Sequence, residues 1–108
     1  MENKVSADLI RGHIDTIILR LLIEGDKYGY EISKRIAVDS EGEYQLKETS
    51  MYSCLKRLEQ EENISSYWGD AEQGGRRRYY HITDRGRELY ERNKREWKFA
   101  KMIIDKLI

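Results

Sequence analysis

Residues 64–82 read ISSYWGDAEQGGRRRYYHI, and this stretch decides the fold. Its outer parts, 64–68 and 76–82, are aromatic and roughly alternating, while residues 69–75 between them are rich in turn formers. Alternation on both sides of a glycine-containing turn is typical of a β-hairpin. We therefore expect two paired strands, with Tyr80 and Ile82 in the core.

The segment before the hairpin, Thr49 to Glu62, predicts a helix with two unlike faces. At about 100° per residue, one side is apolar and consists of Met51, Cys54, Leu55 and Leu58. The opposite side carries hydroxyl, amide and ammonium groups, on Thr49, Ser53, Lys56 and Gln60, with Tyr52 and Arg57 at its flanks. We expect the first side to pack and the second to stay available to a partner.

Two helices are expected upstream of this one. Apolar residues at helical spacing predict one over Leu9–Ile23, which Gly25-Asp26 ends, and a shorter one over Tyr28–Val38, with Tyr30 in the core. Residues 39–43 read as a loop.

One long helix is expected after the hairpin. Thr83 is a suitable N-cap and Asp84 suits the first turn, so the helix should run to about Leu107. The fold class is then mainly α with a β-hairpin. It consists of a winged helix-turn-helix domain in residues 1–83 and a C-terminal dimerisation helix in residues 84–108.

Charge is distributed unevenly along the chain. The 108 residues include 20 Lys and Arg and 20 Asp and Glu, so the formal net charge is zero. Residues 76–95 alone contain eight basic and three acidic side chains. Phosphates attract such a local basic cluster, although three arginines beside a turn could also simply protect an exposed hairpin edge.

Composition argues against several classes of protein. One cysteine, Cys54, allows no intrachain disulfide, and no stretch reaches the roughly 18 apolar residues of a membrane span. Asp15 and Arg20 interrupt the first apolar stretch, so no signal peptide is expected and the predicted location is cytoplasmic. His13 and His81 lie in different elements, so we expect no catalytic or metal site and no cofactor.

Four motifs in this order resemble the PadR family of transcriptional regulators. They are LIEG at 22–25, YGYEI at 28–32, TSMYSCLKRLE at 49–59 and GRRRYYHIT at 75–83. The resemblance covers nearly the whole chain and fits the short subclass that has one C-terminal helix. It implies a repressor that binds a pseudo-palindromic operator as a homodimer.

The residues expected at double-stranded DNA follow from the polar helix face together with this resemblance. Base edges need short polar and basic side chains, and the wing should contact the phosphates. The expected set is Tyr28, Lys34, Thr49, Ser50, Tyr52, Ser53, Lys56, Arg57, Gly74, Gly75, Arg76 and Arg77.

The last helix carries a seam with the 4-3-4-3 spacing of a heptad. The expected dimer interface is Leu89, Asn93, Trp97, Ala100, Ile104 and Leu107. Two-fold pairing through this seam would place two reading helices on two half-sites. The alternative is that the helix folds back on the first helix of its own chain.

Trp97 is either a large interface anchor or part of a binding site for a small aromatic effector. Residues 64–70 and 73–77 are similar to those of a multidrug-binding repressor of the family, in which a tryptophan stacks on flat drugs between subunits. The resemblance implies a pocket made of Leu9, Gly12, Asp15, Asn93, Trp97 and Lys101. Lys101 stands where that repressor has an acidic residue, so we expect Asp15 and Lys101 to approach each other near Trp97.

Two functions remain open at this point. A DNA-binding repressor is the first, and a winged-helix protein–protein interaction module with a basic wing is the second. Operator preference and a steep dependence on salt would separate them.

Overall fold

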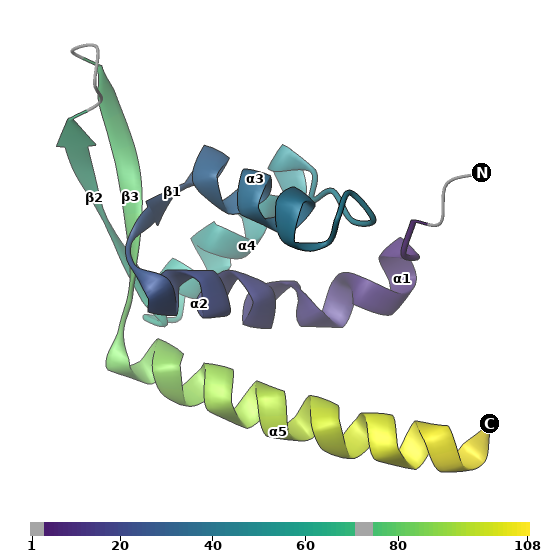
Figure 1. The fold of residues 1–108 in the computed structure, drawn as a ribbon. Helices are drawn as coiled ribbons and strands as arrows, with labels where there is room; N and C mark the ends of the chain where they lie inside the picture. The colour runs from purple at the N-terminus through teal and green to yellow at the C-terminus, as the bar shows by residue number, and fades with distance from the viewer. Residues whose placement is uncertain (1–3, 71–74) are drawn as a thin grey trace.

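The computed structural model describes residues 4–70 and 75–108 and has the predicted mainly helical architecture with a β-hairpin. The elements are α1 (Ala7–Ile10), η1 (Arg11–His13), α2 (Ile14–Glu24), β1 (Lys27–Tyr28), α3 (Gly29–Asp39), α4 (Glu48–Gln60), β2 (Ile64–Asp70), β3 (Arg76–Ile82) and α5 (Asp84–Leu107). Figure 1 shows α2, α3 and α4 grouped beside the hairpin, with α5 running past them. Gly74 lies outside the described residues.

The sheet has three strands in the order β1-β3-β2, all antiparallel. The hairpin pairs Ile64 with Ile82 at its base and Asp70 with Arg76 at its outer end. The short strand β1 was not predicted, because two residues give no periodic signal. It pairs Lys27 with Tyr80 and Tyr28 with Tyr79, and so joins the wing to the start of α3.

The core lies where α2, α3 and α4 meet the base of the hairpin. Its fully enclosed side chains are Ile18, Leu19, Leu22, Ile32, Met51, Leu55, Leu58, Ile64 and Ile82. Burial of Met51, Leu55 and Leu58 confirms the apolar face predicted for α4, and Tyr80 and Ile82 are buried as expected. The prediction for Tyr30 is wrong: its side chain is 63% exposed, because it lies on the outer side of the first turn of α3.

The first predicted helix is interrupted. Instead of one helix over 9–23, α1 gives way to a 3-10 turn over Arg11–His13 before α2 begins. Gly12 lies in that turn, and glycine weakens helical structure because its backbone has the most freedom to lose.

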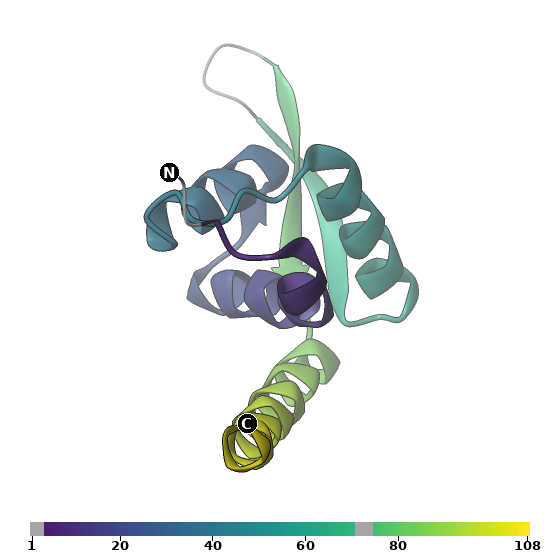
Figure 2. The same cartoon turned by 90° about the vertical axis from the view of Figure 1, so that its right-hand side faces the viewer.

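Helix α5 is anchored at its start and runs below the other elements, where Figure 2 shows it nearly end-on. The Thr83 hydroxyl accepts a hydrogen bond from the Gly86 amide at 3.1 Å, which confirms the predicted N-cap. Gly86 is buried, and a methyl group there would lie 2.1 Å from the carbonyl oxygen of Asn63. The first half of α5 packs against α2 through Leu89 and Tyr90.

No helix in the described residues is both long enough and apolar enough to span a bilayer.

Candidate nucleic-acid interface

The outer face of α4 is open to solvent. Thr49, Ser50, Ser53 and Lys56 are all exposed. The opposite face is fixed by the buried side chains of Met51, Leu55 and Leu58. A rigid helix therefore presents short hydroxyls and one ammonium group outward, which is the arrangement that major-groove reading requires.

Tyr52 leans sideways from this face rather than straight outward. Its hydroxyl group lies against Gly29 at the first turn of α3, where an added methyl group would be 2.3 Å from the Tyr52 oxygen. The ring is still 47% exposed. Tyr52 thus sits in the angle between α3 and α4, where it can reach a phosphate or the edge of a base.

The three wing arginines have different partners. The Arg78 guanidinium donates to Glu59 at 3.2 Å and to the Ser66 hydroxyl at 3.0 Å, so it ties β3 to α4. Arg77 stacks over the ring of Tyr28 at 4.4 Å, and Arg76 stacks over Trp68 at 5.3 Å. Neither of these two has a carboxylate partner in the part of the chain that the structure describes.

Aromatic rings fix the wing to the start of α3. Tyr79 of β3 stacks on Tyr67 of β2 at 5.7 Å and meets Tyr28 edge-on at 5.6 Å. Gly69 makes room for the Tyr79 ring, because a methyl group at residue 69 would lie 2.6 Å from that ring. A cavity of about 460 Å³ opens between the wing and α4, lined by Tyr28, Tyr30, Tyr52, Trp68 and Arg77 among others.

The loop between α2 and β1 reaches both strands of the wing. The Tyr67 hydroxyl donates to the Asp26 carboxylate at 2.5 Å, and His81 Nδ1 lies 2.8 Å from the other oxygen of Asp26. Partial burial acts to raise the pKa of Asp26, but the hydrogen bonds from Tyr67 and His81 outweigh it and hold that pKa below its ordinary value. No pattern in the sequence indicated this cluster.

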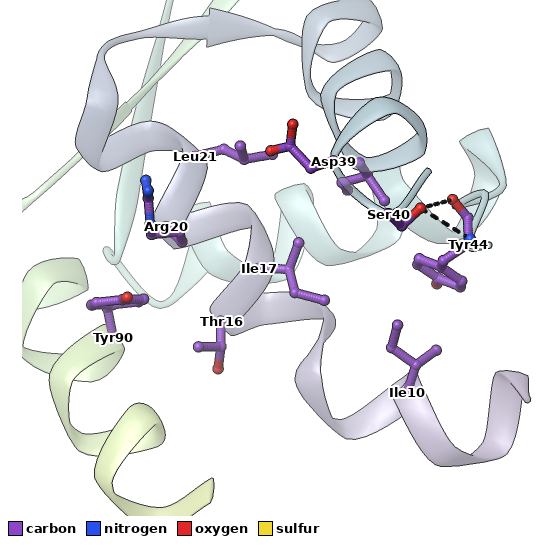
Figure 3. Close-up of a pocket in the computed structure, with 10 residues that line it drawn as sticks. Ile10, Thr16, Ile17, Arg20, Leu21, Asp39, Ser40, Tyr44 and Tyr90 are labelled. Carbon is purple, nitrogen blue, oxygen red and sulfur yellow. Dashed lines mark hydrogen bonds between the residues drawn. The ribbon is translucent and has the colours of Figure 1, made fainter. Parts of the chain in front are cut away.

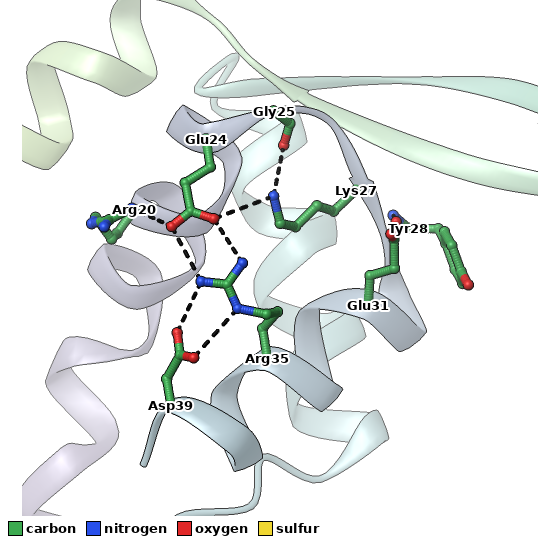
Figure 4. A network of polar contacts seen from close by, with 8 residues as sticks. All are labelled: Arg20, Glu24, Gly25, Lys27, Tyr28, Glu31, Arg35 and Asp39. Atoms are coloured by element: carbon green, nitrogen blue, oxygen red, sulfur yellow. Dashed lines mark hydrogen bonds and ion pairs between the residues drawn. The ribbon is translucent and has the colours of Figure 1, made fainter. Parts of the chain in front are cut away.

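A network of ion pairs joins α2 to α3 (Figure 4). The Arg35 guanidinium reaches Glu24 at 2.7 Å and Asp39 at 3.1 Å, and Arg20 also pairs with Glu24 at 2.8 Å. Hydrogen bonds from Arg35 and Arg20 lower the pKa of Glu24 to about 2. This network holds the two helices that support α4.

Of the other expected DNA contacts, Tyr28 and Lys34 lie at the start and on the outside of α3. Tyr28 is half-buried and its amide donates to the Glu31 side chain at 3.1 Å, while Lys34 is exposed. Arg57 lies apart from them, since its guanidinium pairs with Asp15 at 2.7 Å and with Glu61 at 3.6 Å. Gly75 is exposed next to Arg76.

The expected approach of Asp15 to Lys101 is wrong within the chain. Asp15 is held by Arg57, and Lys101 pairs with Asp105 on its own helix at 2.9 Å. Lys101 therefore has its partner one turn away on α5, and Asp15 has its partner across on α4. Gly12 and Asp15 instead line a groove of about 730 Å³ together with Thr49, Ser53 and Arg57.

The seam of α5 is covered at one end and open at the other. Leu89, Asn93 and Ala100 are half-buried, and Trp97 meets His13 edge-on at 4.6 Å while 44% exposed. Ile104 and Leu107 are 49% and 77% exposed, and Leu9 on α1 is 74% exposed. The predicted fold-back alternative therefore describes the first half of α5 and leaves the second half uncovered.

A cavity that the sequence did not indicate lies between α2, the end of α3 and α5 (Figure 3). Its volume is about 370 Å³ and its wall is mostly apolar, with Ile10, Ile17, Tyr44 and Tyr90 facing it. Arg20 and Asp39 stand at its edge. Residues from α1, α2, α3, the loop after α3 and α5 meet there, which is why periodicity in one segment could not reveal the cavity.

Cys54 and the histidines form no reactive or metal-binding cluster. Cys54 is half-buried, and burial followed by the charge of Asp15 raises the pKa of its thiol. Raising that pKa keeps the thiol protonated and poorly nucleophilic. Across residues 4–70 and 75–108, no three His, Cys, Asp or Glu side chains gather as a metal site would need.

Comparison with known proteins agrees with this geometry. Residues 18–92 match the family described as "Transcriptional regulator PadR-like family". A transcriptional regulator from Clostridium thermocellum is 49% identical and superposes with a TM-score of 0.89, covering 96% of this chain and 98% of that one. A PadR family transcription regulator from Clostridium difficile is 41% identical with a TM-score of 0.76, covering 89% and 98%. An uncharacterised protein from Lysinibacillus sphaericus is 46% identical over 94% of this chain and 93% of its own length.

Proposed function

Because the chain belongs to the PadR-like family of transcriptional regulators, we propose that it acts as a homodimeric repressor on a pseudo-palindromic operator. Members of this family are regulators and not enzymes, in agreement with the absence of catalytic activity expected from the sequence. In the proposed complex, α4 enters the major groove and the wing lies along the adjacent backbone.

The observation that carries this proposal is the pairing of an uncovered polar face on α4 with two arginines that lack carboxylate partners among the described residues. Thr49, Ser53 and Lys56 face outward from a helix whose other side is locked in the core. Arg76 and Arg77 extend from the neighbouring wing. Phosphate contacts then supply affinity and position, and the α4 side chains supply sequence discrimination.

The Arg77 site fits a backbone phosphate. Stacking on Tyr28 holds the guanidinium in place at 4.4 Å, and Tyr52 lies in the same cavity. A pre-positioned arginine loses less side-chain entropy on binding and can donate two parallel hydrogen bonds to a phosphate.

Dimerisation is proposed through the open half of α5. The large apolar side chains exposed from Trp97 onward are Trp97, Phe99, Met102, Ile104, Leu107 and Ile108. Of these, Trp97, Ile104, Leu107 and Ile108 fall on one face of the helix at about 100° per residue, and an exposed apolar face of this kind marks an interaction site. Covering it with a second copy would set two α4 helices on half-sites about one turn of DNA apart.

A planar aromatic effector remains part of the proposal, at the Trp97 end of the seam. Trp97 and Trp68 are the two tryptophans, so a Trp68→Phe variant reports on Trp97 alone. We expect planar aromatic compounds to quench its fluorescence and to release the selected DNA. Absence of quenching up to the solubility limit would remove the effector site and leave the DNA-binding proposal intact.

Selection of duplexes from a random-sequence library tests the proposed function. A repressor should enrich one short palindrome and bind it with an affinity that falls steeply as salt rises. The runner-up, an interaction module for an acidic protein, predicts no enriched sequence. That result would overturn the operator proposal.

A further inference from the structure

Helix α4 itself holds the wing through one of its carboxylates. Glu59 lies in the last turn of α4, and its two oxygens accept hydrogen bonds from the Ser66 hydroxyl of β2 at 2.6 Å and from the Arg78 guanidinium of β3 at 3.2 Å. The same hydroxyl accepts a third hydrogen bond, from Arg78 Nε at 3.0 Å. These three side chains therefore form a closed cycle of hydrogen bonds, here called the wing clamp.

The wing clamp and the second hold on the wing come from different elements. Asp26 contacts Tyr67 and His81 from the loop between α2 and β1. Successive side chains of a strand point to opposite faces of the sheet, so the wing clamp and the Asp26 contacts lie on opposite faces of the hairpin. The hairpin is thus held on both faces. Of these two holds, the wing clamp is the one that starts from the helix whose outer face is proposed to read the bases.

We propose that Glu59 is a positioning residue that fixes the wing relative to α4, so that the wing arginines meet the DNA backbone while α4 lies in the major groove. This inference rests on the proposed function, because the angle of the wing affects affinity only if Arg76 and Arg77 contact phosphates. Arg78, the third wing arginine, then has its guanidinium bound to Glu59 and not to a phosphate.

The two proposed phosphate contacts differ in how closely they depend on the wing clamp. Arg76 lies two residues before Arg78 on the same face of β3, and it stacks over Trp68, which is paired with Arg78 across the hairpin. Arg77 has a separate support, because it stacks over Tyr28 at the start of α3. We therefore expect the contact of Arg76 with DNA to depend on the wing clamp more than that of Arg77.

Ser66→Ala tests the wing clamp without changing the charge of the protein. It removes the hydroxyl that joins Glu59 to Arg78 and leaves an ion pair whose side chains are 33% and 47% exposed. Losing one or two hydrogen bonds of ordinary strength should raise the Kd for the selected duplex by about two- to ten-fold. The matched control is Ser65→Ala, the same change at an exposed position on the opposite face of β2, which should leave the Kd unchanged.

Double-mutant cycles separate positioning from a general loosening of the fold. Fluorescence anisotropy at constant ionic strength would give the Kd of each variant for the selected duplex. If the wing clamp acts through the wing, Ser66→Ala should cost much less affinity in an Arg76→Ala background than in the unchanged protein. In a Thr49→Ala background, which alters the outer face of α4, its cost should stay the same as in the unchanged protein. A merely structural role would give equal losses in both backgrounds.

Neutralising the carboxylate gives a second test. Glu59→Gln has two opposite effects, since it weakens the wing clamp and removes a negative charge on the side of the protein that faces the duplex. Glu62→Gln removes the same charge at an exposed position just beyond the end of α4, and it measures the effect of charge alone. We expect Glu59→Gln to bind the selected duplex more weakly than Glu62→Gln. Equal or tighter binding by Glu59→Gln would overturn the inference.

A further measurement needs no DNA. Backbone ¹⁵N order parameters at Arg76 and Arg78 should be lower in Ser66→Ala than in the unchanged protein, and unaltered in Ser65→Ala. Equal Kd values for these two serine variants, or equal losses in the two backgrounds of the cycles, would contradict the role of Glu59. Failure to enrich any duplex would instead overturn the proposed function, and the order parameters would still decide whether Glu59 holds the wing.

Discussion

Which side chains of α4 and the wing are available to a partner depends on the contacts of single residues as much as on their exposure. Tyr52 has its hydroxyl against Gly29, Arg77 is stacked on Tyr28, and Arg78 is bound to Glu59. Two neighbouring arginines on one strand therefore have different roles. Arg77 is available to a phosphate, while Arg78 supports the fold.

Replacing Arg77 with alanine should weaken binding to every duplex by a similar factor. Loss of one phosphate contact lowers the slope of log K against log salt by about one unit. Anisotropy titrations at several salt concentrations measure the slope. Lys106→Ala removes a positive charge from the far end of α5 and should leave the slope unchanged, and a matching drop in that control would contradict the assignment of Arg77.

Gly86→Ala should destabilise the protein by roughly 1–3 kcal/mol, because the added methyl group meets the Asn63 carbonyl and must push α5 from the base of the wing. Urea unfolding followed by circular dichroism measures the change. The matched control is Gly12→Ala, where nothing lies within 4 Å of the new methyl group. Equal stability of the two variants would show that the close contact at Gly86 is relieved without cost.

At the scale of elements, the sequence predicted the structures that follow a periodic or local sequence pattern. It missed the structures that depend on contacts between distant segments. The apolar stripe of α4, the β-hairpin and the Thr83 cap all follow from local patterns, and the structure confirms them. Strand β1 and the Asp26 cluster arise because the α2–β1 loop reaches the wing in space. The Asp15–Arg57 pair likewise joins residues 42 positions apart, which no local pattern can indicate.

The contact between α2 and α3 should weaken in acid. Glu24 has a pKa of about 2 in the folded protein, below the ordinary 4.5. The stability that its ion pairs contribute to the folded protein is therefore complete above about pH 4.5 and is lost as pH falls toward 2. Glu24→Gln should lower the Tm at neutral pH and show a smaller further decline on acidification. Thermal unfolding from pH 7 downward tests this, with Glu43→Gln as the control. Parallel acid profiles for Glu24→Gln and the unchanged protein would contradict it.

Whole-molecule shape argues for assembly. The chain extends 54 × 38 × 21 Å, and Figure 1 shows α5 continuing past α2 and below α1. Large apolar side chains of its second half are exposed. A helix that is anchored by its first half and uncovered in its second is suited to pair with another copy. The seam predicted from the heptad spacing is consistent with this arrangement, and the dimer stays a prediction.

Ile104→Glu should convert the dimer to monomer, because it places a charge at the centre of the proposed interface. Sedimentation velocity measures the mass, and Lys98→Gln, which makes the same change in net charge on the other side of the helix, should remain dimeric. The monomer should keep its circular dichroism and lose most of its affinity for a two-half-site duplex. A variant of unchanged mass would exclude the seam as the interface.

The central claim is that the outer face of α4 lies in the major groove, and a DNA-cleaving probe on that face tests it most directly. With Cys54→Ala as background, iron–EDTA attached at Ser53→Cys should cut the selected duplex in two clusters related by a two-fold axis, about one helical turn apart. The same probe at Lys106→Cys should give only background cleavage. Equal cleavage from the two sites would mean that α4 does not enter the duplex.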